Sequence, residues 1–135
     1  MSSDKALILI VDDDFDFLEI NRIILEGAGY RVATATNPAE AQTRIDAEAP
    51  DLVITDLMMT SIDAGFAFAA QLKDDPRTAG VPIIISTSVS SALGLDFHPD
   101  TPEDLAKMNV DAYFDKPIDG RALVAKVGEL LGARS

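Results

Sequence analysis

The chain has 135 residues, of which 47% are hydrophobic and 25% are charged, and its formal net charge is −12. This size and balance exclude a disordered chain and predict a single domain over residues 1–135, with a core at about 6–132. The acidity argues against nucleic-acid binding, because phosphate contacts need a basic stripe, and the lack of cysteine excludes disulfides and thiolate chemistry. No apolar stretch has the length of a membrane span, so we expect a cytoplasmic protein that does not contact a membrane.

The first apolar run, at residues 6–11, is rich in isoleucine, leucine and valine and predicts a buried parallel strand. It ends in three consecutive acids, Asp12, Asp13 and Asp14. A helix is expected next, and the apolar residues at helical spacing predict its buried face. These residues are Phe17, Ile20, Ile24 and Ala28.

A second strand is predicted at residues 30–35, followed by a helix with a clear start signal. Asn37 has the side chain of an N-cap, Pro38 suits the first helical position, and Glu40 lies three residues after the cap. Ala41 and Ile45 are expected on the buried face of this helix.

Three more strands are predicted along the rest of the chain. Residues 52–55 run into Asp56, residues 82–87 follow a polar loop, and residues 111–115 precede Lys116. Further helices are expected after Gly65, Thr101 and Asp119. Strand and helix therefore alternate five times, which predicts an α/β fold with a parallel sheet and helices on both of its faces.

Polar residues lie at the carboxyl ends of four predicted strands, where ligands bind in open parallel sheets. These are Asp12 and Asp13, then Asp56, Thr87 and Lys116. Two carboxylates about 4 Å apart repel each other by roughly 4 kcal/mol at an effective dielectric of 20, so the cluster favours a bound cation. Hard oxygen ligands suit Mg²⁺, and a carboxylate beside Mg²⁺, a lysine and a hydroxyl can accept a phosphoryl group.

With these pieces in order, the chain resembles the receiver domain of two-component response regulators. The matching segments are residues 8–13, 50–56, 82–87 and 116–117. The resemblance covers nearly the whole chain and implies a flavodoxin-like, doubly wound sheet of five parallel strands in the order 2-1-3-4-5, with five helices.

The resemblance also implies a role for individual residues. Asp56 would accept the phosphoryl group, while Lys116 and Thr87 would bind the transferred phosphate. The implied Mg²⁺ ligands are Asp12, Asp13, Asp56 and the backbone carbonyl of Met58, and the implied switch residues are Thr87 and Tyr113.

The partners implied by the resemblance are a sensor histidine kinase or a histidine phosphotransfer protein, and a downstream protein target. Phosphorylation would switch these protein contacts, with no enzyme activity beyond self-phosphotransfer and self-dephosphorylation. We expect a monomer or a weak homodimer without an output domain. Whether the domain acts alone or comes from a larger protein stays open.

Some positions depart from the family pattern. Thr60 replaces the usual proline, the turn Asp63-Ala-Gly65 is one residue longer, and the segment between Thr87 and Lys116 is longer by several residues. Because Met58 and Val89 are apolar and cannot position an attacking water, we predict slow self-dephosphorylation.

Two alternatives remain open. The altered loop after Asp56 is compatible with a pseudo-receiver, an interaction module that is not phosphorylated. The pattern Asp12-x-Asp14 also resembles the start of a haloacid-dehalogenase-type phosphatase, although Asp16 stands where that family has threonine or valine. Asp14 itself is expected to cap a helix, and His98 to lie in an exposed loop.

Overall fold

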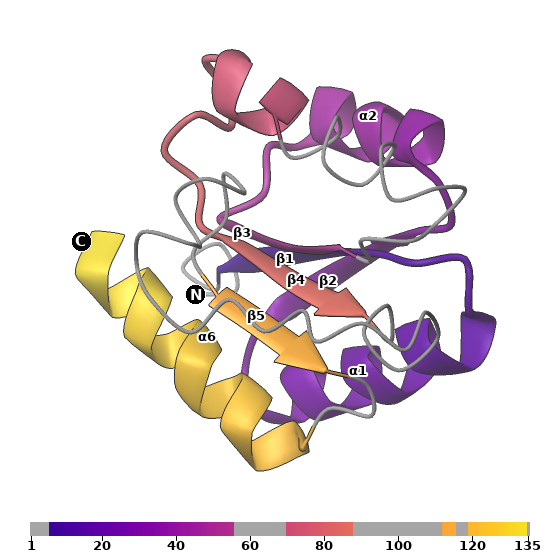
Figure 1. Ribbon diagram of the computed structural model, residues 1–135, viewed down its shortest axis with the longest axis vertical. Coiled ribbons are helices and arrows are strands. Elements are labelled where there is room, and N and C mark those ends of the chain that lie inside the picture. The colour runs from indigo at the N-terminus through magenta and orange to yellow at the C-terminus, as the bar shows by residue number, and fades with distance from the viewer. Residues whose placement is uncertain (1–5, 56–69, 88–111, 116–118, 135) are drawn as a thin grey trace.

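The computed structural model describes residues 6–55, 70–87, 112–115 and 119–134 (Figure 1). Its strands are β1 (Leu7–Val11), β2 (Arg31–Ala35), β3 (Leu52–Thr55), β4 (Ile83–Thr87) and β5 (Ala112–Asp115). Its helices are α1 (Phe15–Gly27), α2 (Pro38–Ala47) and α6 (Gly120–Arg134), and residues 70–74 are also helical.

The strands form one parallel sheet in the order β2-β1-β3-β4-β5. Helices α1 and α6 cover one face of this sheet, while α2 and the helix at 70–74 cover the other (Figure 1). The predicted α/β class with a parallel sheet is therefore confirmed. The helices predicted after Gly65 and Thr101 fall wholly or partly outside the described residues, so the count of five helices stays a prediction.

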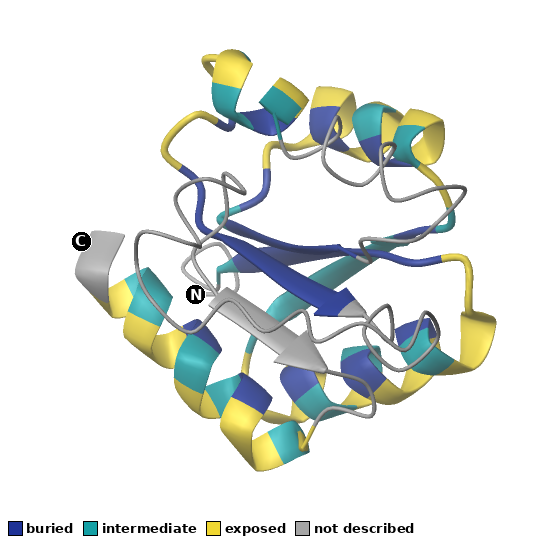
Figure 2. Cartoon of the chain, viewed as in Figure 1, coloured by how far each residue is buried: buried dark blue, intermediate teal, exposed yellow. Residues whose placement is uncertain are grey.

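The sheet is buried on both faces in its central strands, and the helices expose their outer sides (Figure 2). All five residues of β1 and all four of β3 are buried. A continuous run of apolar residues suits such a strand because every side chain loses contact with water, whichever way it points. The core cluster comprises Ile8, Ile10, Leu18, Leu25, Leu52, Ile54, Ile84, Leu123 and Val127.

The buried face of α1 differs from the predicted one. Leu18, Asn21 and Leu25 are buried, whereas Ile20 is 58% exposed and Ala28 is the exposed C-cap. Phe17 and Ile24, also predicted to be buried, are half-buried. The prediction chose the wrong stripe because α1 carries more apolar residues than one face can bury. Asn21 is accommodated inside by donating a hydrogen bond to the Phe17 carbonyl at 2.8 Å.

The start of α2 agrees with the prediction. The Asn37 side chain accepts a hydrogen bond from the Glu40 N–H at 2.8 Å, and Pro38 begins the helix. The Glu40 carboxylate in turn accepts from the Thr36 N–H at 2.8 Å, so two backbone donors at the helix entry are satisfied. Ala41 and Ile45 are buried as predicted.

The polar loop before β4 is tied down by side chains. The buried Thr78 hydroxyl donates a hydrogen bond to the Leu72 carbonyl at 2.6 Å. Arg77 forms ion pairs with Asp46 of α2 at 2.6 Å and with Asp75 at 2.8 Å. These contacts join the loop to α2 and fix the point at which β4 enters the sheet.

Candidate functional site

The strand register brings four carboxyl ends to one edge of the sheet. Val11 of β1 is paired with Thr55 of β3, and Thr55 is paired with Ile85 of β4. Thr87, the last residue of β4, is paired with Asp115 of β5. Because all of these strands are parallel, their carboxyl ends lie at the same edge of the sheet.

Asp12 is held at this edge by the sheet itself. Its N–H donates to the Ala35 carbonyl at 3.0 Å, which continues the β1–β2 ladder one residue past β1. The residue is fully buried, and its Oδ1 accepts a hydrogen bond from the Asp14 N–H at 2.8 Å. The first predicted metal ligand is thus fixed in both backbone and side chain.

Asp13 and Asp14 have different surroundings although they are adjacent. Asp14 is the N-cap of α1, since its side chain accepts from the Asp16 N–H at 3.0 Å and from the Phe17 N–H at 3.3 Å. The prediction that Asp14 caps a helix is confirmed. Asp13, between the anchored Asp12 and the cap, is exposed. Its carboxylate is accessible to a cation from solution.

The donor chemistry at the end of β1 suits Mg²⁺, because Asp12 and Asp13 supply carboxylate oxygens and no softer ligand. Among the described residues, no three acidic, histidine or cysteine side chains come together as a metal site. The remaining predicted ligands, Asp56 and Met58, lie outside the described residues, and so does Lys116. Thr87 and Tyr113 are placed by their backbones in β4 and β5, while their side chains are outside the description.

One buried polar residue at this edge was not predicted from the sequence. Ser86, the penultimate residue of β4, is fully buried. Among the residues that the structure describes, none forms a hydrogen bond with its hydroxyl. Only the identity of Ser86, a hydroxyl after three isoleucines in a buried strand, could have drawn attention to it.

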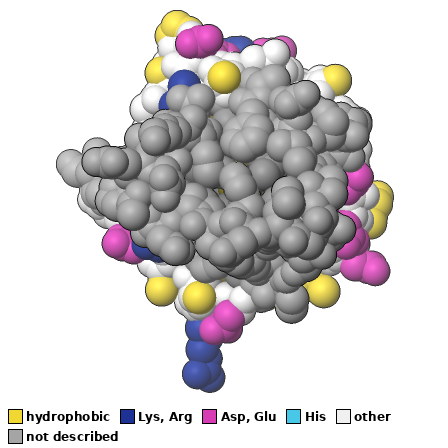
Figure 3. Space-filling model, in the orientation of Figure 1, with side chains coloured by type: hydrophobic (Ala, Val, Ile, Leu, Met, Phe, Trp, Pro, Cys, Tyr) yellow, Lys and Arg dark blue, Asp and Glu magenta, His cyan; other side chains and the backbone are white. Residues whose placement is uncertain are grey.

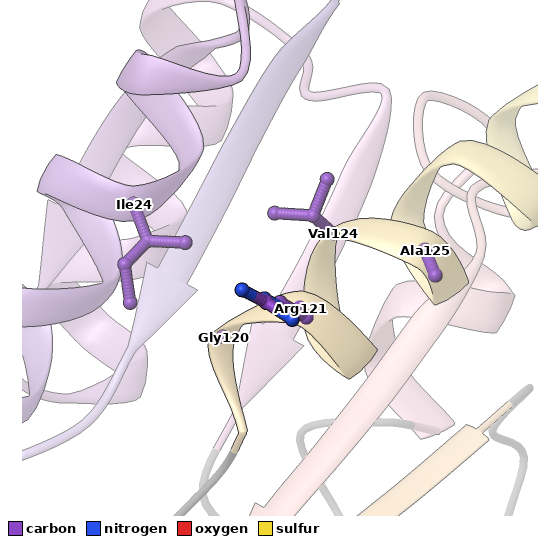
Figure 4. A pocket seen from close by; sticks show the side chains of 5 residues that line it. All are labelled: Ile24, Gly120, Arg121, Val124 and Ala125. Carbon is purple, nitrogen blue, oxygen red and sulfur yellow. The ribbon is translucent and has the colours of Figure 1, made fainter.

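The outer side of α1 presents large apolar side chains to solvent. Phe15 is 72% exposed, Ile20 is 58% exposed and Ile23 is 59% exposed. Beside them, a pocket of about 520 Å³ lies between α1 and α6 (Figure 4). It is lined by Ile24, Gly120, Arg121, Val124 and Ala125. Exposed apolar side chains next to a pocket are typical of a protein-docking surface.

Helix α1 also carries charged side chains. On α1, Arg22 forms ion pairs with Glu19 at 2.8 Å and with Glu26 at 2.7 Å, and its hydrogen bond lowers the pKa of the Glu19 carboxyl. Acidic side chains lie at several places around the outline of the molecule in Figure 3. On the face viewed there, the described basic side chains form no continuous stripe.

No helix within the described ranges is long and apolar enough to cross a bilayer.

A search of protein families matches residues 8–128 to the model of the response regulator receiver domain. A curated relative, the DNA-binding dual master transcriptional regulator RpaA of Synechocystis sp., is 33% identical over 128 residues. The alignment covers 92% of this chain and 48% of RpaA. The chain spans between 26% and 51% of the length of eight such curated relatives.

Solved structures give the same result. A CheY-like response regulator receiver domain protein from Methanospirillum hungatei JF-1 superposes with a TM-score of 0.78 at 26% identity, covering 97% of both chains. The signal receiver domain of a signal transduction histidine kinase from Syntrophus aciditrophicus superposes with a TM-score of 0.75 at 28% identity. That alignment covers 95% of this chain and 91% of the other.

Proposed function

This chain belongs to the response regulator receiver domain family of two-component systems, and from that premise we propose that it accepts a phosphoryl group on Asp56. Receiver domains interact with histidine kinases and with downstream effectors. The donor proposed here is the phosphohistidine of a sensor kinase or of a histidine phosphotransfer protein. The acceptor is one oxygen of the Asp56 carboxylate.

The transfer balances without a further reactant. A carboxylate oxygen of Asp56 forms a bond to phosphorus as the phosphorus–nitrogen bond of the donor breaks, and the released imidazole takes up a proton. Lys116 offsets the negative charge of the phosphoryl oxygens, and the Thr87 hydroxyl hydrogen-bonds to one of them afterwards. We propose no activity on other substrates, so the chain would catalyse only its own phosphorylation and dephosphorylation.

The observation that carries this proposal is the pairing of β1 with β3. Val11 and Thr55 are partners in the register, and the acids Asp12 and Asp56 are the next residues in the chain after them. Because β1 and β3 are adjacent and parallel, Val11 and Thr55 lie side by side at the carboxyl edge of the sheet, and the proposal places both acids at this edge. The buried, anchored Asp12 and the exposed Asp13 beside it form the part of the site that is already built.

Mg²⁺ is the cofactor that this donor set fits, with Asp12, Asp13, Asp56 and the Met58 carbonyl as the proposed ligands. When bound, the ion would offset negative charge on the phosphoryl oxygens. Asp12 would contribute from a fixed position, because its backbone and Oδ1 are already hydrogen-bonded. The finer features of the fold, a flavodoxin-like sheet with five helices in total, belong to the same proposal.

The α1 surface supports the proposed contact with a phosphodonor protein. Ile20 and Ile23 are exposed on the helix that begins directly after the acids, and the pocket beside Ile24 could receive apolar side chains of the donor. Burying apolar surface contributes about 25 cal/mol per Å² to association, before the costs of binding. A donor docked here would lie close to the carboxyl edge of the sheet.

The decisive experiment treats the protein with a small acyl-phosphate donor and Mg²⁺ and reads the intact mass. The wild type should gain a single phosphate, a chelator of Mg²⁺ added before the donor should prevent this gain, and Asp56→Asn should gain none. Asp16→Asn is the matched control, since it removes an acid from the first turn of α1 without touching a proposed ligand. A folded wild-type protein that gains no phosphate would contradict the proposal and favour the pseudo-receiver.

The proposed donor surface can be tested separately with a histidine phosphotransfer protein that phosphorylates the wild type. Ile23→Glu should slow transfer from this protein donor and leave the reaction with the small donor unchanged. Thr43→Glu on α2 is the control, since it adds the same charge at another exposed helix position. Equal rates for both variants with the protein donor would remove α1 from the proposed contact surface.

A further inference from the structure

The buried polar side chains of the described residues differ in whether they have an interaction partner. They are Asp12, Asn21, Thr55, Thr78 and Ser86. The first four interact with neighbouring groups, through hydrogen bonds in the case of Asp12, Asn21 and Thr78. Ser86 is the exception, because its hydroxyl forms no hydrogen bond with any residue in the described part of the chain. Buried polar groups are nearly always paired, so an unpaired one calls for a physical explanation.

The position of Ser86 in the sheet shows what surrounds its hydroxyl. Ser86 and Ile84 are two residues apart in β4 and therefore point to the same face of the sheet. Ile84 belongs to the apolar cluster formed with Leu18 of α1 and Leu123 of α6. The Ser86 hydroxyl thus faces the layer between the sheet and these two helices, where solvent does not reach it.

A second buried hydroxyl shows what a purely structural role looks like. Thr78, in the loop before β4, is also fully buried, but its hydroxyl donates a hydrogen bond of 2.6 Å to the Leu72 carbonyl. Thr78 therefore stabilises the conformation in which it is seen. Ser86 does the opposite, because an unpaired buried hydroxyl raises the free energy of its conformation relative to any other in which the hydroxyl is paired.

The residue that follows Ser86 links this unpaired group to the proposed site. Thr87 ends β4 at the carboxyl edge of the sheet, and its hydroxyl is the proposed partner of the phosphoryl group. A shift of Thr87 toward that group would be transmitted through one peptide unit to Ser86. Proteins commonly keep strained or unpaired groups at the points where a conformational change begins.

We propose that Ser86 is a positioning residue for the switch: its hydroxyl is unpaired in the resting conformation and gains a hydrogen bond when the end of β4 moves upon phosphorylation. This inference rests on the proposed phosphorylation of Asp56. Ser86 raises the free energy of the resting conformation. It thereby lowers the free-energy difference between the resting conformation and the conformation adopted upon phosphorylation. An apolar residue at this position would hold the protein in the resting state.

The test compares wild type with Ser86→Ala, using beryllofluoride with Mg²⁺ as a stable phosphoryl analogue. In the free protein, Ser86→Ala should raise Tm by about 4 °C, because it removes an unpaired buried hydroxyl. The same substitution should weaken the apparent affinity for beryllofluoride about tenfold, because the activated state loses a hydrogen bond. A merely structural role for Ser86 would leave this affinity unchanged.

Two controls separate the effect from stability in general. Ile84→Val, on the same strand and face, should lower Tm with and without beryllofluoride and leave the affinity unchanged. Thr78→Val should lower Tm, since it removes a hydroxyl that is paired. A Tm of Ser86→Ala equal to or below that of wild type would overturn the inference, as would a higher Tm with unchanged affinity. If the wild type does not bind beryllofluoride, the proposed function itself fails.

Discussion

The ends of β1 and β4 lie at the same edge of the sheet, but their buried polar groups are treated differently. At the end of β1, Asp12 is hydrogen-bonded through its backbone and its carboxylate, and Asp14 caps the next helix. At the end of β4, the Ser86 hydroxyl is buried and finds no partner among the described residues. The buried polar group at the end of β1 is therefore hydrogen-bonded without any ligand. The buried hydroxyl at the end of β4 would be stabilised by a conformation that gives it a partner.

This difference suits a site that must combine two tasks. A cation site works best when its ligands are already in place, whereas a switch needs two arrangements that differ little in free energy. In the proposed mechanism, the paired end of β1 would provide the first property, and the Ser86 hydroxyl at the end of β4 would provide the second. Substitutions at the two ends should therefore change different quantities.

The largest effect is expected at the end of β1, for cation binding. Asp13→Asn removes one negative charge from the proposed Mg²⁺ site and should weaken Mg²⁺ binding on the order of a hundredfold. The unfolding free energy should change little, because Asp13 is exposed. Isothermal titration calorimetry measures the affinity, with Asp16→Asn as the control. Equal affinities for wild type and Asp13→Asn would show that the end of β1 does not bind the ion.

The next effect sharpens the contrast between paired and unpaired hydroxyls. Thr78→Val keeps the shape of the side chain but leaves the Leu72 carbonyl without its donor, so unfolding should become easier by about 1–3 kcal/mol. Urea denaturation provides the measurement. Thr43→Val on the exposed side of α2 is the matched control and should have almost no effect. A Thr78→Val variant as stable as wild type would remove the distinction between Thr78 and Ser86.

A smaller effect is expected at the cap of α1. Asp14→Ala removes the acceptor for the Asp16 and Phe17 N–H groups and should lower the unfolding free energy by about 1 kcal/mol. Urea denaturation of Asp14→Ala and of Asp16→Ala separates the cap from general loss of an acid in the first turn. If both variants lose the same stability, the end of β1 is held by charge and not by the cap.

The smallest effect concerns the loop before β4 and depends on pH. The Arg77 hydrogen bond lowers the pKa of the Asp75 carboxyl. This pair therefore stabilises the fold fully at pH values above the ordinary aspartate pKa of about 3.9. That contribution is lost as the pH falls through the lowered folded-state pKa. Arg77→Gln should therefore have a slightly lower Tm than wild type at pH 7. This difference in Tm between the two proteins should become smaller below pH 4. A difference that is constant with pH would indicate that the ion pair contributes nothing.

Much of the sheet could be predicted from the sequence because buried parallel strands need unbroken apolar runs. The predicted strands at 6–11 and 82–87 each began one residue too early. Ala6 and Pro82 do touch the sheet, since their carbonyls accept from the N–H groups of Arg31 and Val53, but they are not strand residues. Apolar character identifies a strand, whereas its first residue depends on pairing with a neighbour.

The face of α1 and the role of Ser86 could not be predicted for related reasons. Helix α1 carries more apolar residues than one face can bury, so spacing alone did not show that Leu18 and Leu25 point inward while Ile20 points outward. The burial of Ser86 and the lack of a hydrogen-bond partner among the described residues can be seen only in the folded structure. The parts of the proposed site at Asp56 and Lys116 lie outside the described residues, so their roles stay predictions.

The ladder hydrogen bond of Asp12 has a consequence for the thermodynamics of ion binding. Because the Asp12 N–H donates to the Ala35 carbonyl, the conformational entropy of this residue is lost when the sheet forms. A cation that later binds there meets a carboxylate that is already ordered, so little of its binding free energy is needed to organise this ligand. The amide proton of Asp12 should accordingly exchange with solvent as slowly as those inside β1.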